Sequence, residues 1–267
     1  MKVLIRGAGD IASGIALRLH RAGMQVVMTD LPAPTAIRRT VCFSQAILLG
    51  EMTVEDVTAR GADSVEEAES LLRRGLIPVL ADPDCACRAQ LRPDALVDAI
   101  LAKRNLGTKI DDAPVVVGIG PGFTAGEDCH AVVETMRGHT LGRVIYRGSA
   151  LPNTNIPGLI GGYAGERVLR APAGGIFCQK LEIGAVVRAG DIAGEVDGEL
   201  MKCTIDGVLR GILADGTPVF KGMKSGDVDP RCKPEYCTTA SDKALAVGGG
   251  VLEAVLNLSG ALRSVSL

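Results

Sequence analysis

The feature that most constrains this chain is a short apolar segment that runs directly into a glycine turn. Residues 2–6 (KVLIR) have the composition of a buried strand, and residues 7–12 (GAGDIA) follow without a break. Apolar residues then recur at helical spacing as far as Leu19, and a second apolar segment, residues 24–28, leads to Asp30. This order of strand, glycine turn, helix, strand and acid is typical of a dinucleotide-binding unit.

The turn suits close approach of a phosphate to the backbone. Gly7 permits the tight bend, and Gly9 leaves room for a pyrophosphate at the helix amino terminus, whose free N–H groups attract anions. Asp30, 23 residues after Gly7, would bind a ribose hydroxyl and favour NAD over NADP. The candidate cofactor-binding residues are Gly7, Ala8, Gly9, Asp10 and Asp30. A fold that keeps the turn without a ligand remains the alternative, since the charge of Asp10 would crowd a diphosphate.

A second glycine turn follows the apolar segment 114–120. Residues 120–126 (GPGFTAG) again suit close approach of a backbone to a ligand. The candidate cofactor-binding residues here are Gly120, Gly122, Phe123 and Thr124. Ligands of open α/β sheets gather at the carboxyl ends of strands, and both turns follow predicted strands. We therefore expect the two turns to line one crevice.

The segment 127–137 is predicted to be helical, which places His130 and Glu134 on one helical face. A neutral imidazole beside a carboxylate suits proton transfer or metal ligation, and Asp128 lies nearby in the sequence. His130, Glu134 and Asp128 are therefore the candidate catalytic residues. The structural alternative is a His–Glu pair that only braces the helix.

Further elements alternate in the manner of an α/β domain. Residues 64–75 predict a capped helix, with Ser64 at the N-cap and Glu67 three residues later. Residues 77–81 predict a strand, and residues 93–103 another helix. The sequence thus predicts an α/β domain with a Rossmann-like parallel sheet over residues 1–165.

The second half of the chain predicts a small all-β module over residues 166–235. A G-x-x-V-x-x-G pattern at 184–190 recurs at 216–222, and the Asp197-Gly198 dipeptide is a hairpin signal between short β-type segments. The pattern resembles the biotinyl/lipoyl-type barrel-sandwich hybrid. The hairpin tip carries no lysine, so we expect neither lipoyl nor biotin attachment and interpret the module as structural or interaction-forming.

A helix is predicted to begin at Ser241 in the last segment, residues 236–267. Three consecutive glycines, residues 248–250, interrupt its apolar face. Each Gly in a helix interior costs ~1 kcal/mol relative to Ala, so three together need a reason. We expect this segment to pack closely against the first domain.

Composition excludes several classes of function. The 29 Lys and Arg against 31 Asp and Glu leave a net charge of −2, which argues against binding to nucleic acid or an anionic membrane. The absence of Trp, with three Tyr and four Phe, further disfavours base stacking. The first residues lack a signal-peptide pattern, and no apolar run approaches ~18 residues, so we expect a cytoplasmic location without a membrane span.

The eight cysteines are too sparse for a disulfide scaffold, and in a reducing compartment they would be thiols. Cys85 with Cys87, and Cys232 with Cys237, are ordinary thiols or sites for a soft metal or a chalcogen. The first spacing is too close for a usual zinc pair, and the second lacks a matching pair. The sequence therefore assigns no metal ligands.

Several segments spread over nearly the whole chain together resemble one family. They are VLIRGAGDIASGIALRL, VVVGIGPGFTAGEDCHAVVETMRGHTLGR, KSGDVDPR with the adjoining CKPEYC, and SDKALAVGGGVLEAVL. They resemble the accessory proteins of selenium-dependent molybdenum hydroxylase systems, the YqeB-type proteins. The resemblance implies a cytoplasmic maturation factor, and its client would be a molybdopterin hydroxylase that carries labile selenium. It transfers no catalytic residues to this sequence.

Three hypotheses stay open at this point. The first is a maturation factor that binds NAD(P), another nucleotide or a molybdopterin-type cofactor in the glycine-rich crevice, with selenium handled by a thiol such as Cys129. The second is an NAD(P)-dependent oxidoreductase that uses His130 and Glu134 in acid–base roles. The third is a non-enzymatic scaffold. The expected partners are a molybdenum hydroxylase or its maturation proteins, while enzyme activity and homo-oligomer formation are left open.

Overall fold

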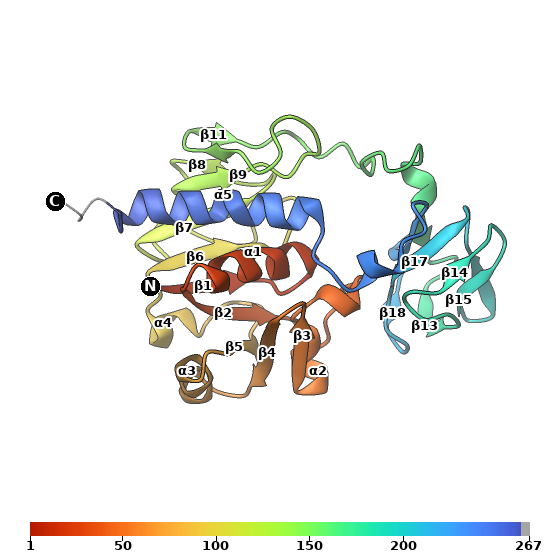
Figure 1. Ribbon diagram of the computed structural model, residues 1–267, viewed down its shortest axis with the longest axis horizontal. Helices are drawn as coiled ribbons and strands as arrows, with labels where there is room; N and C mark the ends of the chain where they lie inside the picture. Colours follow the sequence, from red (N-terminus) through yellow and green to blue (C-terminus); the bar gives the residue numbers. More distant parts are fainter. Residues whose placement is uncertain (263–267) are drawn as a thin grey trace. The chain divides into compact units, whose positions relative to one another are not determined.

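The computed structural model describes residues 1–262, which fall into two compact units (Figure 1). Unit 1 contains residues 1–34, residues 42–153 and the chain from residue 240 on, and unit 2 contains residues 35–41 and 154–239. Residues 35–41 belong to unit 2 because Ile212 N donates to Ile37 O at 2.7 Å. No pattern in the sequence predicts this excursion.

Unit 1 is built on a nine-stranded mixed sheet with the order β10-β9-β7-β6-β1-β2-β5-β4-β3. Six neighbouring strands are parallel: β7, β6, β1, β2, β5 and β4. Strand β9 continues this direction beside β7, whereas β10 and β3 close the two ends in antiparallel pairs. The strands are β1 (Lys2–Arg6), β2 (Gln25–Asp30), β3 (Glu51–Val54), β4 (Val57–Ala62), β5 (Ile77–Ala81), β6 (Ala95–Asp98), β7 (Val115–Ile119), β9 (Ala131–Val133) and β10 (Val144–Ile145).

Two predicted helices of unit 1 form as the sequence indicates. Helix α1 (Asp10–Arg21) follows the first glycine turn, and helix α3 (Val65–Arg73) begins after Ser64, whose hydroxyl accepts a hydrogen bond from Glu67 N. The shorter helices are α2 (Gln45–Leu49), α4 (Arg88–Leu91) and the 3-10 turn η1 (Arg39–Val41), the last of which lies in unit 2.

Helix α5 (Asp242–Ser259) runs alongside α1 within unit 1 (Figure 1). A Cβ on Gly14 would collide with Ala244, and a Cβ on Gly248 would lie 2.8 Å from Gly14 O. The two helix backbones therefore approach closely through glycine faces. This contact gives the physical reason for glycine in the interior of a long helix.

Two other predicted helices were wrong. The segment predicted as a helix over 93–103 contains β6, and the segment predicted as a helix over 127–137 contains β9. Every residue of β6 and β9 is buried, which is typical of strands covered on both faces. Such continuous apolar runs do not alternate, so periodicity alone does not distinguish them from buried helix segments.

Unit 2 is a β module of two four-stranded sheets, with orders β12-β19-β17-β14 and β16-β15-β13-β18. The predicted hairpin at Asp197-Gly198 is confirmed, and both residues have positive φ, at 48° and 84°. The strands are β12 (Val168–Arg170), β13 (Gly175–Gln179), β14 (Val186–Val187), β15 (Ile192–Val196), β16 (Glu199–Lys202), β17 (Gly207–Ile212), β18 (Pro218–Val219) and β19 (Lys224–Asp229). The 3-10 turns η2 (Gly165–Arg167) and η3 (Pro234–Cys237) flank them.

The G-x-x-V-x-x-G repeat has a structural counterpart in unit 2. Val187 in β14 and Val219 in β18 are both buried, and one lies in each four-stranded sheet. The flanking glycines all have positive φ, between 77° and 100°, at positions 184, 190, 216 and 222. Each copy therefore places one short buried strand between two turns that only glycine adopts without strain.

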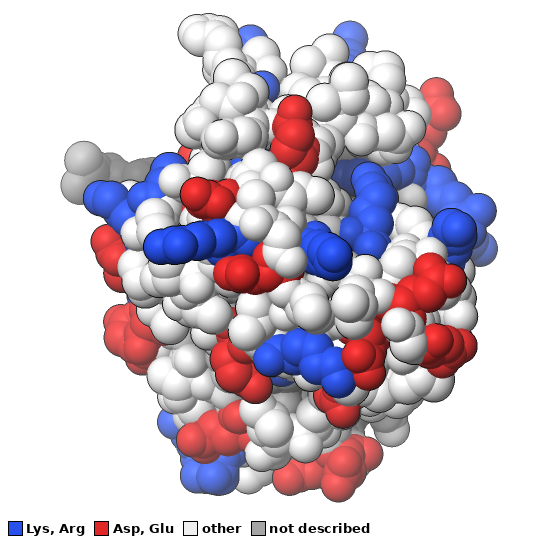
Figure 2. All heavy atoms as spheres, turned by 90° about the vertical axis from the view of Figure 1, so that its right-hand side faces the viewer, with Lys and Arg blue, Asp and Glu red and all other residues white. Residues whose placement is uncertain are grey.

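Charges of both signs are interspersed on the face of the molecule shown in Figure 2. This distribution agrees with the near-balance of acidic and basic residues in the sequence. Within residues 1–262, no helix combines the length and the apolar character needed to cross a membrane.

Candidate functional site

The carboxyl ends of the parallel strands form one edge of the unit 1 sheet. In the strand register, Arg6 at the end of β1 pairs with Thr29 in β2 and with Asp98 in β6, and Asp98 pairs with Gly118 in β7. These residues therefore stand at one level across four neighbouring strands. Both glycine turns begin just beyond that level, because they follow β1 and β7.

The first glycine turn has one tightly packed and one open position. Gly7 has φ +105°, and a Cβ there would lie 2.9 Å from Ala99 O. Gly9, the residue before α1, has the ordinary φ of −70°, and a Cβ there would meet nothing within 4 Å. Gly7 is thus required by the backbone, whereas Gly9 leaves open space at the amino terminus of a twelve-residue helix.

Asp30 ties the end of β2 to this turn. Its Oδ2 accepts a hydrogen bond from Ala8 N at 2.7 Å, and its Oδ1 accepts one from Leu31 N at 2.7 Å. Burial raises the pKa of Asp30 above its usual value, against the opposing effect of the two N–H donors. Each carboxylate oxygen keeps a lone pair, so the group still has acceptor capacity for a ligand hydroxyl.

Asp10 is the first residue of α1 and is half-buried. Its Oδ1 accepts a hydrogen bond from Ile11 N at 2.9 Å. The carboxylate thus already lies at the helix amino terminus, where negative charge is favourable. A phosphate that binds here would have to lie beside Asp10.

The second glycine turn is filled by protein atoms. A Cβ on Gly120 would lie 2.6 Å from Thr135 Oγ1, and a Cβ on Gly122 would lie 2.6 Å from Arg104 N. Phe123 is buried and packs against Gly118, while Thr124 Oγ1 lies 3.0 Å from Ser149 Oγ. No helix follows this turn; Thr124 begins the two-residue strand β8 (Thr124–Ala125), which pairs with β11 (Gly148–Ser149).

The connection between β6 and β7 contacts both turns, through Ala99 at Gly7 and Arg104 at Gly122. A cavity of about 180 Å³ lies at this edge of the sheet beside Arg6. Its lining includes residues 106–108 and none of residues 120–126. The two turns thus share an edge of the sheet, and the cavity reaches Arg6, the residue directly before the first turn.

The three candidate catalytic residues are not on a helix, so the helical pairing of His130 with Glu134 was wrong. His130 Nδ1 accepts a hydrogen bond from Val116 N at 3.0 Å. Glu134 is buried, and its carboxylate accepts hydrogen bonds from three backbone N–H groups, those of Thr135, Met136 and Leu151. Each side chain therefore holds a neighbouring backbone segment.

Asp128, the third candidate, holds the start of the second turn. Its Oδ2 accepts from Thr124 N at 2.8 Å, and its Oδ1 accepts from Asn105 Nδ2 at 3.0 Å. Asn105 belongs to the connection between β6 and β7. The contacts of Asp128 therefore add to those that close the second turn.

Arg6, the last residue of β1, is a further functional candidate. It is 7% exposed, and its Nη1 donates to Thr108 Oγ1 at 3.1 Å and to Asp98 Oδ2 at 3.4 Å. Its Nε and Nη2 both donate to Pro83 O. The guanidinium thus places a fixed positive charge on the wall of the cavity.

The loop after β5 brings Cys85 to the same cavity, beside Arg88. A hydrogen bond from Cys87, together with Thr29 and the charge of Arg6, lowers the pKa of the Cys85 thiol despite its burial. Cys129, by contrast, is fully buried, and burial raises its pKa to about 11. Cys85 is therefore the better candidate for a reactive thiol, and the sequence signal for it is DPDCAC directly after a predicted strand.

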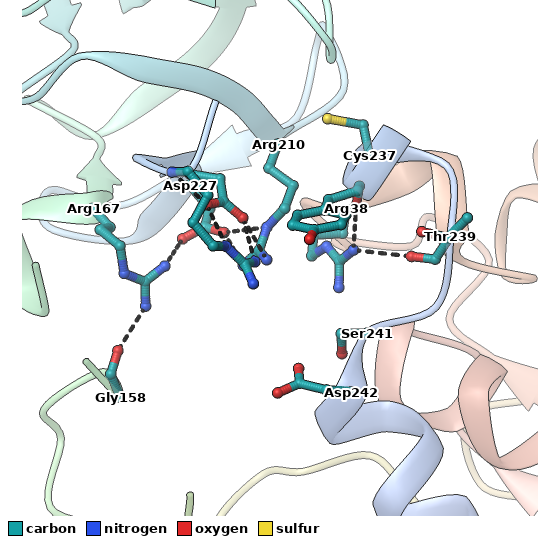
Figure 3. Close-up of polar contacts among 12 residues, drawn as sticks. Arg38, Gly158, Arg167, Arg210, Asp227, Cys237, Thr239, Ser241 and Asp242 are labelled. Atoms are coloured by element: carbon teal, nitrogen blue, oxygen red, sulfur yellow. Dashed lines mark hydrogen bonds and ion pairs between the residues drawn. The ribbon is translucent and has the colours of Figure 1, made fainter. Parts of the chain in front are cut away.

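Unit 2 contains a separate buried network of charges, drawn in Figure 3. Arg210 Nη2 donates to Asp227 Oδ2 at 2.6 Å, and its Nη1 donates to Asp229 Oδ2 at 3.1 Å. Arg167 Nη1 donates to Asp227 Oδ1 at 2.9 Å, and its Nη2 donates to Gly158 O at 3.0 Å (Figure 3). The network joins η2, β17 and β19, and its charges are compensated within the protein.

The same region of unit 2 is held by two further arginines. Arg231 Nη2 donates to Asp229 Oδ2 at 2.6 Å, and its guanidinium lies 4.5 Å from the ring centre of Tyr236. Arg38 Nη2 donates to Tyr236 O at 3.1 Å (Figure 3). These contacts fix residues 231–239 to the module, so we interpret the network as structural.

Fold and site together define a two-unit protein with an open glycine turn, a half-buried acid and a thiol pair at the carboxyl edge of a mixed α/β sheet. The chain is 54% identical over 256 residues to "Uncharacterized protein YqeB" of Escherichia coli strain K12, over 96% of this chain and 47% of that protein. Nearly the whole of this chain is thus similar to YqeB, as its motifs predict. It spans about half the length of this curated relative.

No protein-family model matches the chain. Among solved structures, a succinylglutamate desuccinylase/aspartoacylase of Rhodobacter sphaeroides is 20% identical, covers 51% of this chain and 58% of its own, and has a TM-score of 0.23. An aspartoacylase family protein of Mesorhizobium loti is 11% identical, covers 85% and 84%, and has a TM-score of 0.28. Likenesses this weak carry no argument about the present chain.

Proposed function

We propose that this chain is an accessory factor in the maturation of a selenium-dependent molybdenum hydroxylase, and that its first glycine turn binds a nucleotide- or molybdopterin-type cofactor. The motifs that resemble YqeB-type accessory proteins support the first part, together with the similarity to YqeB itself. The geometry at the carboxyl ends of β1 and β2 supports the second part. The partners in this proposal are the hydroxylase or its other maturation proteins.

The observation that carries the binding proposal is the open space at Gly9. A phosphate approaching from that side would meet the N–H groups of the first turn of α1 and no protein side chain at Gly9 itself. Asp30, at the end of the neighbouring strand, would accept a hydrogen bond from a sugar hydroxyl. In this arrangement the turn positions the anionic part of the ligand and Asp30 its neutral part.

The strand order adds support, and we propose a Rossmann-like interpretation of it. Five parallel strands lie side by side in the order β5-β2-β1-β6-β7. From β1 the chain adds β2 and then β5 on one side, and later adds β6 and β7 on the other side. The order reverses between β1 and β6, and doubly wound sheets bind ligands at that point. The Arg6–Asp98 contact and the first glycine turn both lie there.

An NAD(P)-dependent oxidoreductase is the alternative that Asp30 favours, since an acid at this position suits the ribose of NAD. His130 and Glu134 would then need to exchange their backbone hydrogen bonds for contacts with substrate. A non-enzymatic scaffold is the second alternative, favoured by unit 2. We interpret that module as barrel-sandwich-hybrid-like and suited to docking a partner, since the hairpin tip carries Asp197 and Gly198 rather than a lysine.

The test combines native mass spectrometry of the purified chain with a thermal-shift panel of NAD, NADP, nucleoside diphosphates and molybdopterin-type cofactors. We expect one of these ligands to raise the Tm, because a ligand that binds only the native state stabilises it. Gly9→Ala should abolish that shift, and Gly249→Ala, at another open glycine, should leave it unchanged. A panel without any shift would contradict cofactor binding.

A second arm separates the accessory role from cofactor binding. We expect a strain that lacks this chain to accumulate the hydroxylase in an inactive form, and the Gly249→Ala chain to restore its activity. Restoration by Gly9→Ala as well would leave the accessory role standing and contradict the role of the turn. Normal hydroxylase maturation without the chain would refute the accessory role itself.

A further inference from the structure

The loop after β5 holds two thiols between two cavities of unit 1. Cys85 lines the cavity of about 180 Å³ that also borders Arg6 and Thr108. Cys87 lines a second cavity, of about 430 Å³, which also borders Asp82. The cofactor-binding proposal uses neither thiol.

The backbone holds this loop in one conformation. Cys85 N donates to Asp82 O at 3.1 Å, and Cys87 N donates to Asp82 Oδ2 at 2.8 Å. Cys85 itself has φ +56°, a left-handed conformation that is uncommon for a residue other than glycine. Asp82 therefore fixes the backbone at both cysteines, which lie two residues apart in one loop.

The pKa values of the two thiols are shifted in opposite directions. The hydrogen bond from Cys87 stabilises the Cys85 thiolate and lowers the pKa of Cys85, with help from Thr29 and Arg6. The same hydrogen bond, burial and the Asp82 carboxylate raise the pKa of Cys87. The pair therefore consists of one nucleophile and one proton donor, and the thiolate is the reactive form of cysteine.

The size of the cavity restricts what reaches Cys85. A volume of about 180 Å³ is below the ~300–1,000 Å³ of sites that hold drug-sized ligands. A small molecule of a few heavy atoms fits, and a dinucleotide does not. The wall carries two arginines, Arg6 and Arg88, together with two acids, Asp84 and Asp112, so it suits a small substrate without net charge.

We propose that Cys85 and Cys87 form a dithiol site that reduces the S–S bond of a small disulfide entering the cavity beside Arg6. The Cys85 thiolate attacks one sulfur, so that a mixed disulfide forms and the other sulfur leaves as a thiolate. That leaving thiolate takes the proton of Cys87. The Cys87 sulfur then attacks Cys85 Sγ, which releases the second thiolate and leaves a Cys85–Cys87 disulfide.

The reaction needs no further oxidant or reductant. Two electrons pass from the thiol pair to the substrate disulfide, which leaves as one thiol and one thiolate. An external small-molecule thiol returns the pair to its reduced form by the reverse exchange. The site does not depend on whether the glycine turn binds a cofactor.

The experiment uses bis(2-hydroxyethyl) disulfide as the probe, with acid quenching, alkylation and peptide mass mapping. Every chain carries Cys232→Ser, because Cys232 is exposed and would react independently. In the chain with the intact pair we expect a Cys85–Cys87 disulfide, formed at pH 7 at least about tenfold faster than adducts at Cys129 or Cys203, whose pKa values are about 11. Absence of that disulfide from the folded chain would overturn the proposal.

Variants assign the role of each thiol. Cys87→Ser should accumulate a persistent mixed disulfide at Cys85, because no second thiol resolves it. Cys85→Ser, or Cys85→Ala if the serine variant does not fold, should leave Cys87 unmodified over the same period. Cys129→Ser is the matched buried control and should form the Cys85–Cys87 disulfide at an unchanged rate. An adduct on Cys87 that forms as fast without Cys85 would contradict the assignment.

Discussion

The two glycine turns of unit 1 resemble each other in sequence and differ in what surrounds them. Both follow a buried strand and both leave the same edge of the sheet. At the first, the position of Gly9 is open and a long helix follows. At the second, Thr135 and Arg104 fill the space beside Gly120 and Gly122, and no helix follows.

This comparison teaches that glycine density does not by itself indicate a ligand. A glycine serves a ligand when its missing side chain leaves space that solvent reaches, and it serves packing when another part of the chain fills that space. By this criterion Gly9 suits the proposed binding role, whereas Gly120 and Gly122 of the second turn serve packing. Substitutions at these glycines, at Glu134 and at Asp30 test that division.

The largest effect is expected for Gly122→Ala. The new Cβ would lie 2.6 Å from Arg104 N, and φ is +111°. We expect a loss of roughly 2–4 kcal/mol in the free energy of unfolding, measured by urea denaturation, from strain together with the clash. Gly126→Ala, in the same turn at φ +96° but in open space, carries the strain without the clash and should lose only about 1–2 kcal/mol. Equal losses would remove the packing explanation.

Next comes Glu134→Gln, which tests whether this side chain is scaffold. The carboxylate accepts three backbone hydrogen bonds, at 2.6, 2.6 and 2.8 Å, and an amide would set an N–H₂ group against at least one of the donors. We expect the free energy of unfolding to fall by about 1.5–3 kcal/mol. Glu127→Gln, at an exposed position, is the control and should change stability by less than about 0.5 kcal/mol. A Glu134→Gln chain of native stability would reopen a catalytic role.

A smaller, pH-dependent effect is expected at Asp30. Its folded pKa is raised by burial above 3.8, so on raising the pH the unfolded chain loses this proton first. The contribution of Asp30 to stability is therefore highest below pH 3.8 and declines as the pH rises through the interval up to the folded pKa. The stability of the parent chain minus that of Asp30→Asn, from urea titrations at several pH values, should decline in this interval. If the stability difference rose with pH instead, the folded pKa of Asp30 would be lowered and not raised.

Removal of Asp30 has a second consequence that affects any binding experiment. Ala8 is fully buried, and its N–H donates to the Asp30 carboxylate. Asp30→Ala would leave that donor unsatisfied, at a cost of about 1–3 kcal/mol. Loss of cofactor affinity in Asp30→Ala therefore has to be compared with its loss of stability before it is assigned to the ribose contact.

The smallest effect on stability is expected for Gly9→Ala. The position has an ordinary φ and open space, so only the preference of an N-cap for glycine over alanine is lost, and the free energy of unfolding by urea should fall by no more than about 1 kcal/mol. Affinity for a phosphate-bearing cofactor, measured by calorimetry, should nevertheless fall at least about tenfold, since the methyl group occupies the approach of the phosphate. Destabilisation comparable to that of Gly122→Ala would mean that the two turns are alike after all.

The elements that local patterns specify were predicted well. The strand–turn–helix around Gly7 and Gly9, the cap at Ser64 and the hairpin at Asp197 each depend on residues a few positions apart. The helix predicted over 93–103 was wrong because β6 is an inner strand between β1 and β7 and all of its residues are buried. The repeating apolar residues there match a buried strand and a helix equally well.

The candidate site was predictable in part for the same reason. Gly9, Asp10 and Asp30 follow from one local motif, and the structure places them together at the ends of β1 and β2. The contact of Arg6 with Asp98 joins residues 92 positions apart and has no sequence signal. The lowered pKa of Cys85 also depends on Arg6 and Thr29, which come from other strands.

The bends of the chain, its buried segments and the residues that reach the carboxyl edge of the sheet all follow from local sequence. These properties depend on the backbone preferences and hydropathy of neighbouring residues. Tertiary contacts, in contrast, set which glycine faces open space, which carboxylate holds only backbone and which thiol has a lowered pKa. Those outcomes depend on atoms brought from distant parts of the chain. For Gly122 the decisive neighbour is Arg104, and for the pKa of Cys85 the charge of Arg6 adds to the larger effect of Cys87.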